Sequence, residues 1–366
     1  MEVITSENQT NEPIIDESGK PTHFSSLKKE STIYSDCSRE EFKVSFSELA
    51  EMLGVSNQAI SSMIQRLELP VVQVGKNNYL EPAHVRKLIQ YRLKHNYKCI
   101  TFSTAMAKGG IGKTTITTQV ACYAARNLGY KVLIIDADPQ GNSSLFCRYP
   151  DPGMENLTLR DIFEKEIPVE DTIKKVTSNL HIIPSNLRNS TLDFYISLAQ
   201  LPIKDVFKRL VIDQVRGDYD LIIVDCAPAL NTLNSCICYG TDFNLNIVTP
   251  EEYCISGLNL TKEYFEQMAR KYGSLIEQRC VFNKYSPTLK SSRDFVYKHL
   301  APDAPFRKEF FDTCFRHGTH FEKSVGEKIS VFEFKGKKAP VCEDIENFCS
   351  ELLDITLSTT QSEAIQ

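Results

Sequence analysis

The chain has 366 residues, of which 42% are hydrophobic and 24% are charged, so it can bury a sizeable core. Its formal net charge of −5 argues against a protein that coats DNA. No apolar run approaches the roughly 20 residues that a membrane span needs, and the twelve cysteines are too scattered to indicate a zinc site.

The N-terminal segment is polar and acidic. Residues 1–42 carry four Lys or Arg against nine Asp or Glu, and residues 1–24 have the composition of a disordered segment. An apolar stretch of the kind that signal peptides contain is missing from it. We therefore expect a flexible acidic leader over residues 1–42 and a cytoplasmic protein.

A basic module follows over residues 43–97; counted through Lys98, it has eight Lys or Arg against four Asp or Glu. Apolar residues recur at helical spacing on either side of Gly54, which fits the left-handed position of a turn, and Ser56 fits the N-cap of the second helix. Pro70–Tyr79 predicts a β-hairpin, and Glu81–His95 predicts a helix that leads out of the module. This order of elements is typical of a winged helix-turn-helix.

The second helix of this module is predicted to offer polar side chains to solvent. Such side chains can hydrogen-bond base edges or phosphates, and a lysine at the hairpin tip can reach the DNA backbone. Together with the local positive charge, they indicate nucleic-acid binding. A helix pair that binds nothing is the simpler alternative. The candidate DNA-binding residues are Asn57, Gln58, Ser61, Ser62, Gln65 and Lys76.

A glycine-rich segment lies between a predicted strand, Lys98–Met106, and a predicted helix, Thr115–Leu128. Such a turn directs several backbone N–H groups at one place, where the helix N-terminus adds its positive end, and so binds phosphate. Lys113 would reach the β- and γ-phosphates, and the Thr114 hydroxyl would hold Mg²⁺. The expected nucleotide-binding residues of this loop are Lys108, Gly109, Gly110, Gly112, Lys113, Thr114 and Thr115.

Two later strands are predicted to end in carboxylates. The apolar run Lys131–Ile135 leads to Asp136 and Asp138, and Leu221–Val224 leads to Asp225. Because open α/β sheets bind ligands at the carboxyl ends of their strands, these acids should lie beside the phosphate-binding loop. There, the acid of the second strand would bind Mg²⁺ through a water. For Asp138, capping of the following helix is the simpler alternative.

These segments resemble the ParA/MinD family of ATPases, which have a deviant Walker A motif. In that family an extra lysine opens the loop. Here Lys108 does so, and Ala107 replaces the first Gly of G-x-x-x-x-G-K-[ST]. The string Asp136–Asn142 resembles the ParA switch I region, and Asp225–Pro228 resembles the D-x-P-P of these proteins. The resemblance covers roughly residues 98–353.

The resemblance implies roles for the site residues. Lys108 of one subunit would reach the nucleotide of its partner, Asp138 would orient the attacking water, and Asp136 would lie in the magnesium shell. Pro250 and Asn283 would lie at the base-binding edge. The catalytic residues would then be Lys108, Lys113 and Asp138, and the metal-binding residues would be Thr114, Asp136 and Asp225.

The implied fold is a doubly wound, mostly parallel α/β sheet of the P-loop NTPase type over residues 98–355, with a loose tail over residues 356–366. A winged helix-turn-helix over residues 43–97 would precede it, as in the larger plasmid ParA proteins, where this module binds the operator of the partition operon. Phe24–Tyr34 is the segment that could supply the short dimerisation helix that the family often has.

The implied function is that of a plasmid or DNA partition ATPase, cytoplasmic and nucleoid-associated in a bacterium. It would use ATP and Mg²⁺, form a homodimer, and bind both its operator and nonspecific DNA. Hydrolysis would be slow until a centromere-binding partner of the ParB type stimulates it. An ATP-sensing transcriptional repressor and a MinD-like positioning ATPase are the alternatives.

Two branches of this superfamily are disfavoured by the sequence. Iron proteins of the nitrogenase type hold a cluster through a cysteine a few residues after the Walker B acid, whereas Cys226 follows Asp225 directly. The MinD branch carries a basic, bulky amphipathic helix at the C-terminus, and Asp354–Gln366 has neither feature. We therefore expect reduced thiols that pack as small apolar side chains, and no membrane partner.

Overall fold

The computed structural model describes residues 39–334, 336 and 338–357. Residues 39–366 form one compact unit, distinct from residues 1–38. The candidate dimerisation helix Phe24–Tyr34 and most of the predicted tail therefore lie outside the described residues. Among the helices that the structure describes, none is both long and apolar enough to cross a bilayer.

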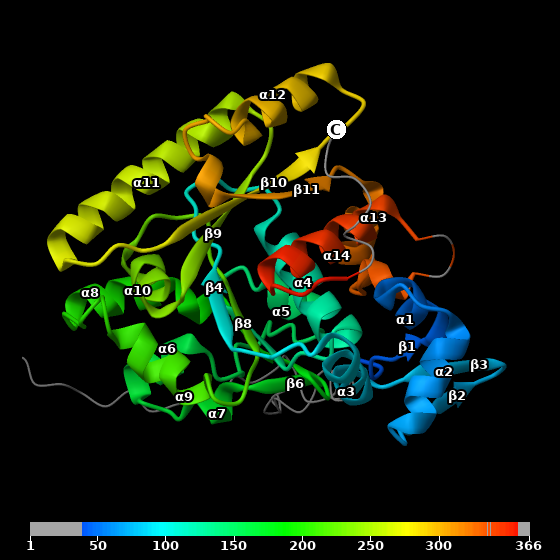
Figure 1. Cartoon of the computed structure of the whole chain (residues 1–366). Coiled ribbons are helices and arrows are strands. Elements are labelled where there is room, and N and C mark those ends of the chain that lie inside the picture. Colours follow the sequence, from blue (N-terminus) through cyan, green and yellow to red (C-terminus); the bar gives the residue numbers. More distant parts are fainter. Residues whose placement is uncertain (1–38, 335, 337, 358–366) are drawn as a thin grey trace, which may run out of the picture. The chain divides into compact units, whose positions relative to one another are not determined.

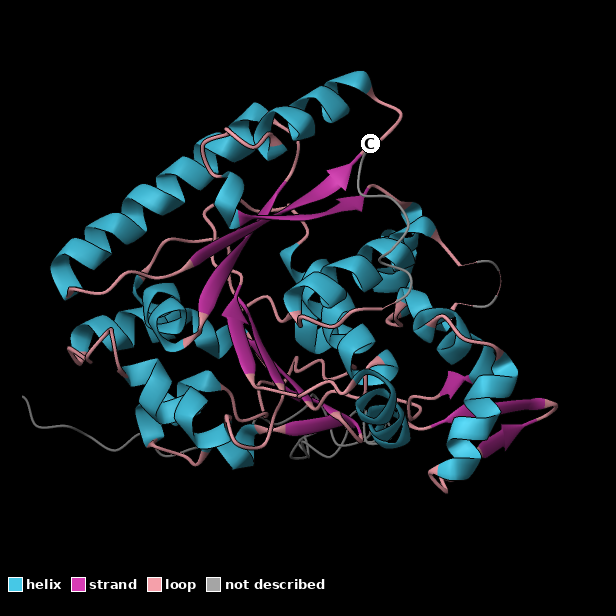
Figure 2. Cartoon of the chain, viewed as in Figure 1, coloured by secondary structure: helices cyan, strands magenta, loops and turns pink. Residues whose placement is uncertain are grey.

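An eight-stranded sheet forms the centre of this unit (Figure 1), and its strands stand out from the surrounding helices in Figure 2. The strand order is β11-β10-β9-β4-β8-β5-β7-β6, and every neighbouring pair is parallel except β6 and β7. The predicted mostly parallel α/β sheet is thus confirmed. Its strands are β4 Ile100–Ser103, β5 Val132–Asp136, β6 Lys174–Thr177, β7 Leu180–Ile183, β8 Leu221–Asp225, β9 Phe243–Val248, β10 Gln278–Tyr285 and β11 Phe310–Arg316.

Helices cover both faces of the sheet, which explains why its central strands are buried and mostly apolar. Every residue of β5, β8 and β9 is buried, as expected for parallel strands that are packed on both sides. One face carries α4 and α14, and the other carries α6, α8 and α10 (Figure 1). The helices of this part are α4 Lys113–Asn127, α5 Asn142–Phe146, α6 Leu159–Lys165, α7 Val169–Thr172, α8 Leu192–Leu198, α9 Asp213–Val215, α10 Thr232–Gly240, α11 Glu252–Tyr272, α12 Lys290–Leu300, α13 Thr319–Glu327 and α14 Pro340–Leu352.

The N-terminal elements are two short helices and a small sheet. Ser45 caps α1 Phe46–Leu53 in a capping box with Glu48, and Gly54 ends it at φ 62. Ser56 then caps α2 by accepting the Ala59 N–H at 3.1 Å. The expected turn residue and N-cap are both confirmed. The remaining elements are α2 Asn57–Arg66, α3 Pro82–Leu93 and the antiparallel sheet of β1 Val44–Ser45, β3 Asn77–Leu80 and β2 Val72–Val74.

Ion pairs and close packing tie these elements to the large sheet. Arg86 of α3 reaches Asp220 just before β8, with Nη2 3.0 Å from Oδ1. Arg126 in the last turn of α4 donates to the Glu48 carboxylate of α1 at 2.8 Å. Gly129 at φ 68 lies so close to α3 that a Cβ there would be 2.5 Å from the Pro82 carbonyl oxygen. The helix that carries Lys113 therefore contacts the N-terminal elements directly.

The structure corrects several predicted boundaries. The strand predicted over Lys98–Met106 is paired only over residues 100–103, because the chain leaves the sheet to form the loop. The helix predicted from Thr115 begins at Lys113, since Gly112 at φ 92 already serves as its N-cap. Strands β6, β7 and β11 were not predicted from the sequence. At the ends, Arg39 and Phe42 of the predicted leader and Leu357 of the predicted tail are buried.

Candidate functional site

Three loops meet at the carboxyl edge of the sheet. The phosphate-binding loop follows β4, the Asp136–Asp138 segment ends β5, and Asp225 ends β8, which lies between these two strands. Asp136 and Asp225 are direct neighbours in the register of β5 and β8. Strands β4 and β8 are neighbours, but the connection after β4 leads to β5 on the β8 side, and the connection after β8 leads to β9 on the β4 side. Open α/β sheets bind ligands at the place where the connections of two neighbouring strands run in opposite directions.

The loop has the backbone shape that phosphate binding requires. Gly110 and Gly112 adopt φ values of 72 and 92, which lie in the left-handed region that favours glycine. Gly109 packs against Pro228, where a Cβ would still fit at 3.7 Å. The loop passes directly into α4, so the positive end of this helix faces the same space.

Lys113 is the buried cation of the site. Its residue is only 7% exposed, and its Nζ donates to the Lys108 carbonyl oxygen at 3.3 Å. Burial lowers the pKa of Lys113, while the charges of Asp225 and Asp138 act in the opposite direction. A buried ammonium held among backbone carbonyls and carboxylates is suited to neutralise phosphate oxygens.

Two serines hold the paired carboxylates, and the sequence analysis did not single them out. Ser143 donates its hydroxyl to Asp225 at 2.8 Å, and Ser144 donates both its hydroxyl and its N–H to Asp136, at 2.7 and 2.8 Å. Burial, followed by the charge of Asp225, raises the pKa of Asp136 to about 8. Burial also raises the pKa of Asp225.

These oxygen ligands fit a magnesium ion. The Thr114 side chain lies near enough to Asp225 to act against the rise of its pKa, so a hydroxyl and two buried carboxylates converge beside the phosphate-binding loop. No cluster of three or more His, Cys, Asp or Glu in the described part of the chain is arranged to bind a metal by itself. Mg²⁺ keeps several waters and takes further ligands from substrate phosphates, so it requires few ligands from the protein.

Asp138 lies at the mouth of the same site. It is 9% exposed, and its Oδ1 accepts the N–H of Gln140 at 2.9 Å. Its own N–H donates to Asp136 at 3.2 Å. The residue that caps α5 is Gly141, so helix capping does not account for Asp138.

Lys108 is paired within its own chain. Its Nζ lies 2.9 Å from Oε2 of Glu251, a residue beyond the end of β9, and this contact lowers the pKa of Glu251. The side chains of Lys108 and Glu251 are 29% and 60% exposed, so the pair is accessible to solvent. Neither the pair nor the role of Glu251 was expected from the sequence, because 143 residues separate the partners.

The end of β10 supports the loop from outside. Asn283 donates to the carbonyl oxygen of Ile111 at 2.8 Å, and Lys284 donates to that of Gly110 at 2.9 Å. Asn283 and its neighbour Lys284 were expected at a base-binding edge, whereas the contact of Lys284 with the loop was not expected. Pro250 lies after β9 at the same edge. Thr115 lies in the first turn of α4, where its carbonyl oxygen accepts the Thr118 hydroxyl at 3.1 Å.

A buried amide, also missed, fixes the start of the loop. Asn244 of β9 accepts the Ala105 N–H at 2.8 Å and donates to the Ala105 carbonyl oxygen at 2.9 Å. This pairing continues the sheet contact between β9 and β4 beyond Ser103. Cys226, the residue after β8, is also buried, and its thiol contacts the Val224 carbonyl oxygen of that strand at 3.6 Å.

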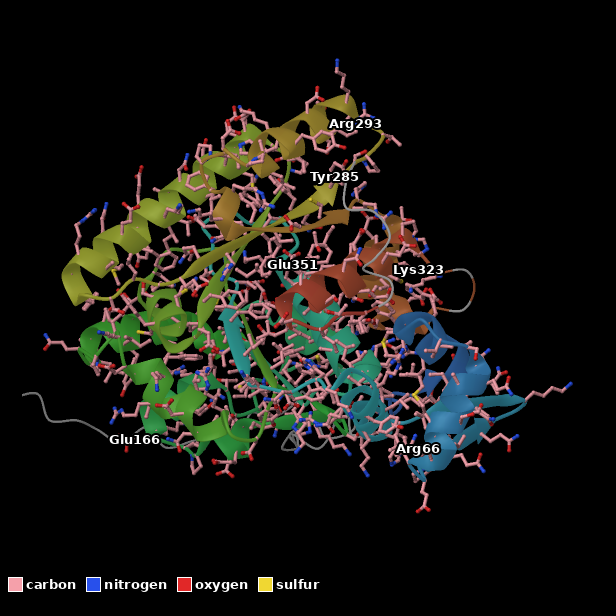
Figure 3. The ribbon with its side chains drawn as sticks, in the orientation of Figure 1. Arg66, Glu166, Tyr285, Arg293, Lys323 and Glu351 are labelled. Atoms are coloured by element: carbon pink, nitrogen blue, oxygen red, sulfur yellow. The ribbon has the colours of Figure 1, made fainter. Side chains whose placement is uncertain are left out.

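The candidate DNA-binding side chains lie apart from this site. The residues of α2 that were predicted to face solvent are all exposed, while Ile60 and Ile64 form the buried side of the helix. Lys76 is exposed in the two-residue turn between β2 and β3. Figure 3 shows Arg66 at the end of this helix. The exposed candidates are Asn57, Gln58, Ser61, Ser62, Gln65 and Lys76.

Comparison with known proteins agrees with this geometry. A family model described as an AAA domain (AAA_31) matches residues 98–277. An uncharacterized protein of Methanocaldococcus jannaschii, MJECL24, is 30% identical over 56% of this chain and 82% of its own length. The chromosome partitioning protein ParA of Caulobacter vibrioides is 27% identical over 63% of this chain and 86% of its own.

A solved structure shares the fold. The ATP complex of a variant of Cyanothece McdA matches with a TM-score of 0.60 and 21% identity, over 71% of this chain and 98% of that one. At this level of identity the likeness concerns the fold of the ATPase part.

Proposed function

The chain belongs to the ParA-type ATPases, and from that premise we propose that it is a DNA partition ATPase that works as an ATP-dependent dimer. The observation that carries the proposal is the convergence of Lys113, Thr114, Asp136 and Asp225 at one sheet edge. A lysine, a hydroxyl and two carboxylates around a glycine loop form a site for a nucleoside triphosphate with Mg²⁺.

Each side chain has a distinct task in this proposal. The loop N–H groups and Lys113 bind the phosphates, and Thr114 and Asp225 hold Mg²⁺, with Asp136 behind them. The ion, when bound, neutralises charge on the phosphate oxygens. Asp138 orients the attacking water from the mouth of the site. Because a carboxylate that only orients water is a weak activator, hydrolysis is slow in the isolated protein.

Lys108 contributes to the site only after the protein has dimerised. In the family this lysine reaches the nucleotide of the partner subunit, and here it must first leave Glu251. The ATP-bound dimer then binds nonspecific DNA, and a centromere-binding partner of the ParB type stimulates hydrolysis and release. The winged helix-turn-helix formed by α1, α2 and the β2–β3 hairpin binds the operator of the same operon.

Three substitutions test the nucleotide site. Lys113→Ala should abolish ATP binding, because the phosphates lose their buried cation. Asp138→Ala should bind ATP and accumulate as a dimer, and Lys108→Ala should bind ATP without hydrolysing it. Binding is measured with a fluorescent ATP analogue, dimerisation by sedimentation and hydrolysis by phosphate release. Rapid turnover by the Asp138 variant, or a wild-type protein that stays monomeric with ATP and Mg²⁺, contradicts the proposal.

DNA binding is tested separately, on operator and random DNA, with ATP, with ADP and without nucleotide, over a range of salt. We expect ATP-dependent binding to random DNA that weakens steeply with salt, because contacts to phosphates release counterions. A protein that binds only its operator and shows no ATPase stimulation is an ATP-sensing repressor instead. Sedimentation with liposomes in the presence of ATP would identify a MinD-like positioning ATPase.

A further inference from the structure

Two consecutive residues of β10 reach the same loop. The amide of Asn283 donates to the Ile111 carbonyl oxygen at 2.8 Å, and the ammonium of Lys284 donates to the Gly110 carbonyl oxygen at 2.9 Å. Successive side chains of a regular strand point to opposite faces of the sheet. A regular strand could therefore bring only one of these two side chains to the loop.

A β-bulge resolves this conflict. Phe282 of β10 pairs with Cys314 of β11, and the next pair is Tyr285 with Arg316. The chain therefore advances three residues along β10 but only two along β11 between these pairs. Lys284 takes up the extra residue at φ 57, in the left-handed region, and its N–H donates to the Asn283 side-chain oxygen at 2.8 Å. Figure 3 shows Tyr285, the next residue, at the end of this strand. Bulges re-aim side chains, and strained backbone of this kind is concentrated at functional sites.

The two contacts fix the direction of two peptide groups in the loop. The chain has no cis peptide bond among its described residues, so each carbonyl points away from the N–H of the same peptide group. Because the Gly110 and Ile111 carbonyls point at β10, the N–H groups of Ile111 and Gly112 point into the loop. Neither N–H donates to any other group in the described part of the chain.

We propose that Asn283 and Lys284 act as a carbonyl clamp, a pair of positioning residues that hold the loop with its N–H groups directed at the nucleotide phosphates. This inference rests on the proposed nucleotide binding and adds to it. Its residues lie at the edge where the base was expected to bind. The clamp acts on the phosphates, however, since the side-chain oxygen and one N–H of Asn283 are already engaged within the protein.

Packing supports a role for Asn283 in shaping the loop. A Cβ on Gly112 would lie 2.3 Å from Nδ2 of Asn283, so the amide occupies the space that a side chain at residue 112 would need. Asn283 is 4% exposed, and its substitution would disturb the core. Lys284 is exposed, so we expect its replacement to leave the fold intact, and it is the residue to test.

The test compares Lys284→Met, Lys284→Arg and the wild-type protein. Binding of a fluorescent ATP analogue with Mg²⁺ is measured directly, and inorganic tripolyphosphate is then used as a competitor. We expect Lys284→Met to weaken both ligands by the same factor of about ten, the effect of losing one charge-assisted hydrogen bond. Lys284→Arg, which keeps a cationic donor, should restore most of the affinity for both. The melting temperature without nucleotide should not change.

Lys94 provides the matched control. Like Lys284 it is exposed and has a left-handed backbone conformation, with φ 56, but it lies at the end of α3 rather than at the loop. Lys94→Met should bind both ligands like the wild type. If Lys284→Met loses ATP affinity but keeps tripolyphosphate affinity, the residue contacts the base and the clamp is wrong. If Lys284→Met binds both ligands normally, the clamp is also wrong. A wild-type protein that binds neither ligand contradicts the proposed function instead.

Discussion

Gly112 shows how a single residue can determine the site. Its φ of 92 suits glycine alone, and the space beside its Cα is filled by the Asn283 amide. Gly112→Ala should therefore weaken ATP binding at least about tenfold, because the loop must deform to accept the methyl group. Gly217→Ala is the control, since a Cβ there meets no atom within 4 Å. Equal ATP affinity of both variants in a fluorescence titration would show that the loop tolerates the change.

The pair of Lys108 and Glu251 gives a second prediction at this scale. In the proposed dimer Lys108 would have to leave Glu251 to reach the partner subunit, so Glu251→Gln should raise the fraction of ATP-bound dimer. The effect should be a few-fold, because an exposed ion pair contributes at most about 1 kcal/mol. Sedimentation with ATP and Mg²⁺ measures it. Glu252→Gln, the neighbouring carboxylate, serves as the control, and a response of that variant equal to that of Glu251→Gln would rule out a specific pair.

The sequence predicts the site residues that belong to a local motif and misses those that do not. Lys113, Thr114 and the acids at the ends of β5 and β8 follow from a glycine turn and two apolar runs. Ser143 and Ser144 lie only a few residues beyond Asp138, but no spacing rule singles them out. The contacts of Glu251 with Lys108 and of Lys284 with Gly110 require strands distant in the sequence to become neighbours, so no local pattern reveals these contacts.

At the scale of elements, the turn that joins α3 to β4 contains a titratable contact. His95 lies with its Nε2 2.6 Å from the Tyr130 hydroxyl, and burial lowers the pKa of His95 below its usual 6.5. His181, near Tyr219, has its pKa lowered in the same way. In both cases the unfolded chain takes up the proton more readily than the folded protein does.

The free energy of unfolding should therefore decrease as the pH falls below about 6.5, because His95 and His181 then take up protons in the unfolded chain. His95→Gln should reduce this loss, since one of the two groups no longer titrates. Urea unfolding at several pH values between about 5 and 8 measures the slope of stability against pH. Replacement of the exposed His317 by Gln should leave the slope as in the wild type, and an unchanged slope in the His95 variant would contradict the assignment.

The strands that could be predicted from the sequence include those in which every residue is buried. Strands β5 and β8 are buried at every residue, and their apolar runs are visible in the sequence. Strands β6 and β11 lie at the two edges of the sheet and are only partly buried, so their composition does not separate them from loops. The bulge in β10 depends on its register with β11, which no single segment encodes.

At the scale of the whole molecule, the ATPase site and the predicted operator-binding helices share one element. Helix α4 begins at Lys113 in the loop, and its last turn holds Glu48 of α1 through Arg126. We expect Arg126→Gln to keep normal ATP binding but to lose most of the difference in operator affinity between the ATP and ADP forms. Fluorescence anisotropy with operator DNA measures that difference. Arg209→Gln, an exposed arginine on the far side of the sheet core, is the control, and a nucleotide effect that survives in the Arg126 variant excludes this route.

The length of α4 determines how far a movement at one end of this helix displaces the other end. Its 15 residues at about 1.5 Å each span about 22 Å, and a helix of this length moves as a stiff rod. A tilt of a few degrees at the end that holds the phosphates thus shifts the other end by on the order of 1 Å. That is enough to change which hydrogen bonds a neighbouring helix can make with a DNA groove. Under the proposed function, α4 would therefore transmit nucleotide binding to the operator-binding helices as a rigid element, without a hinge between them.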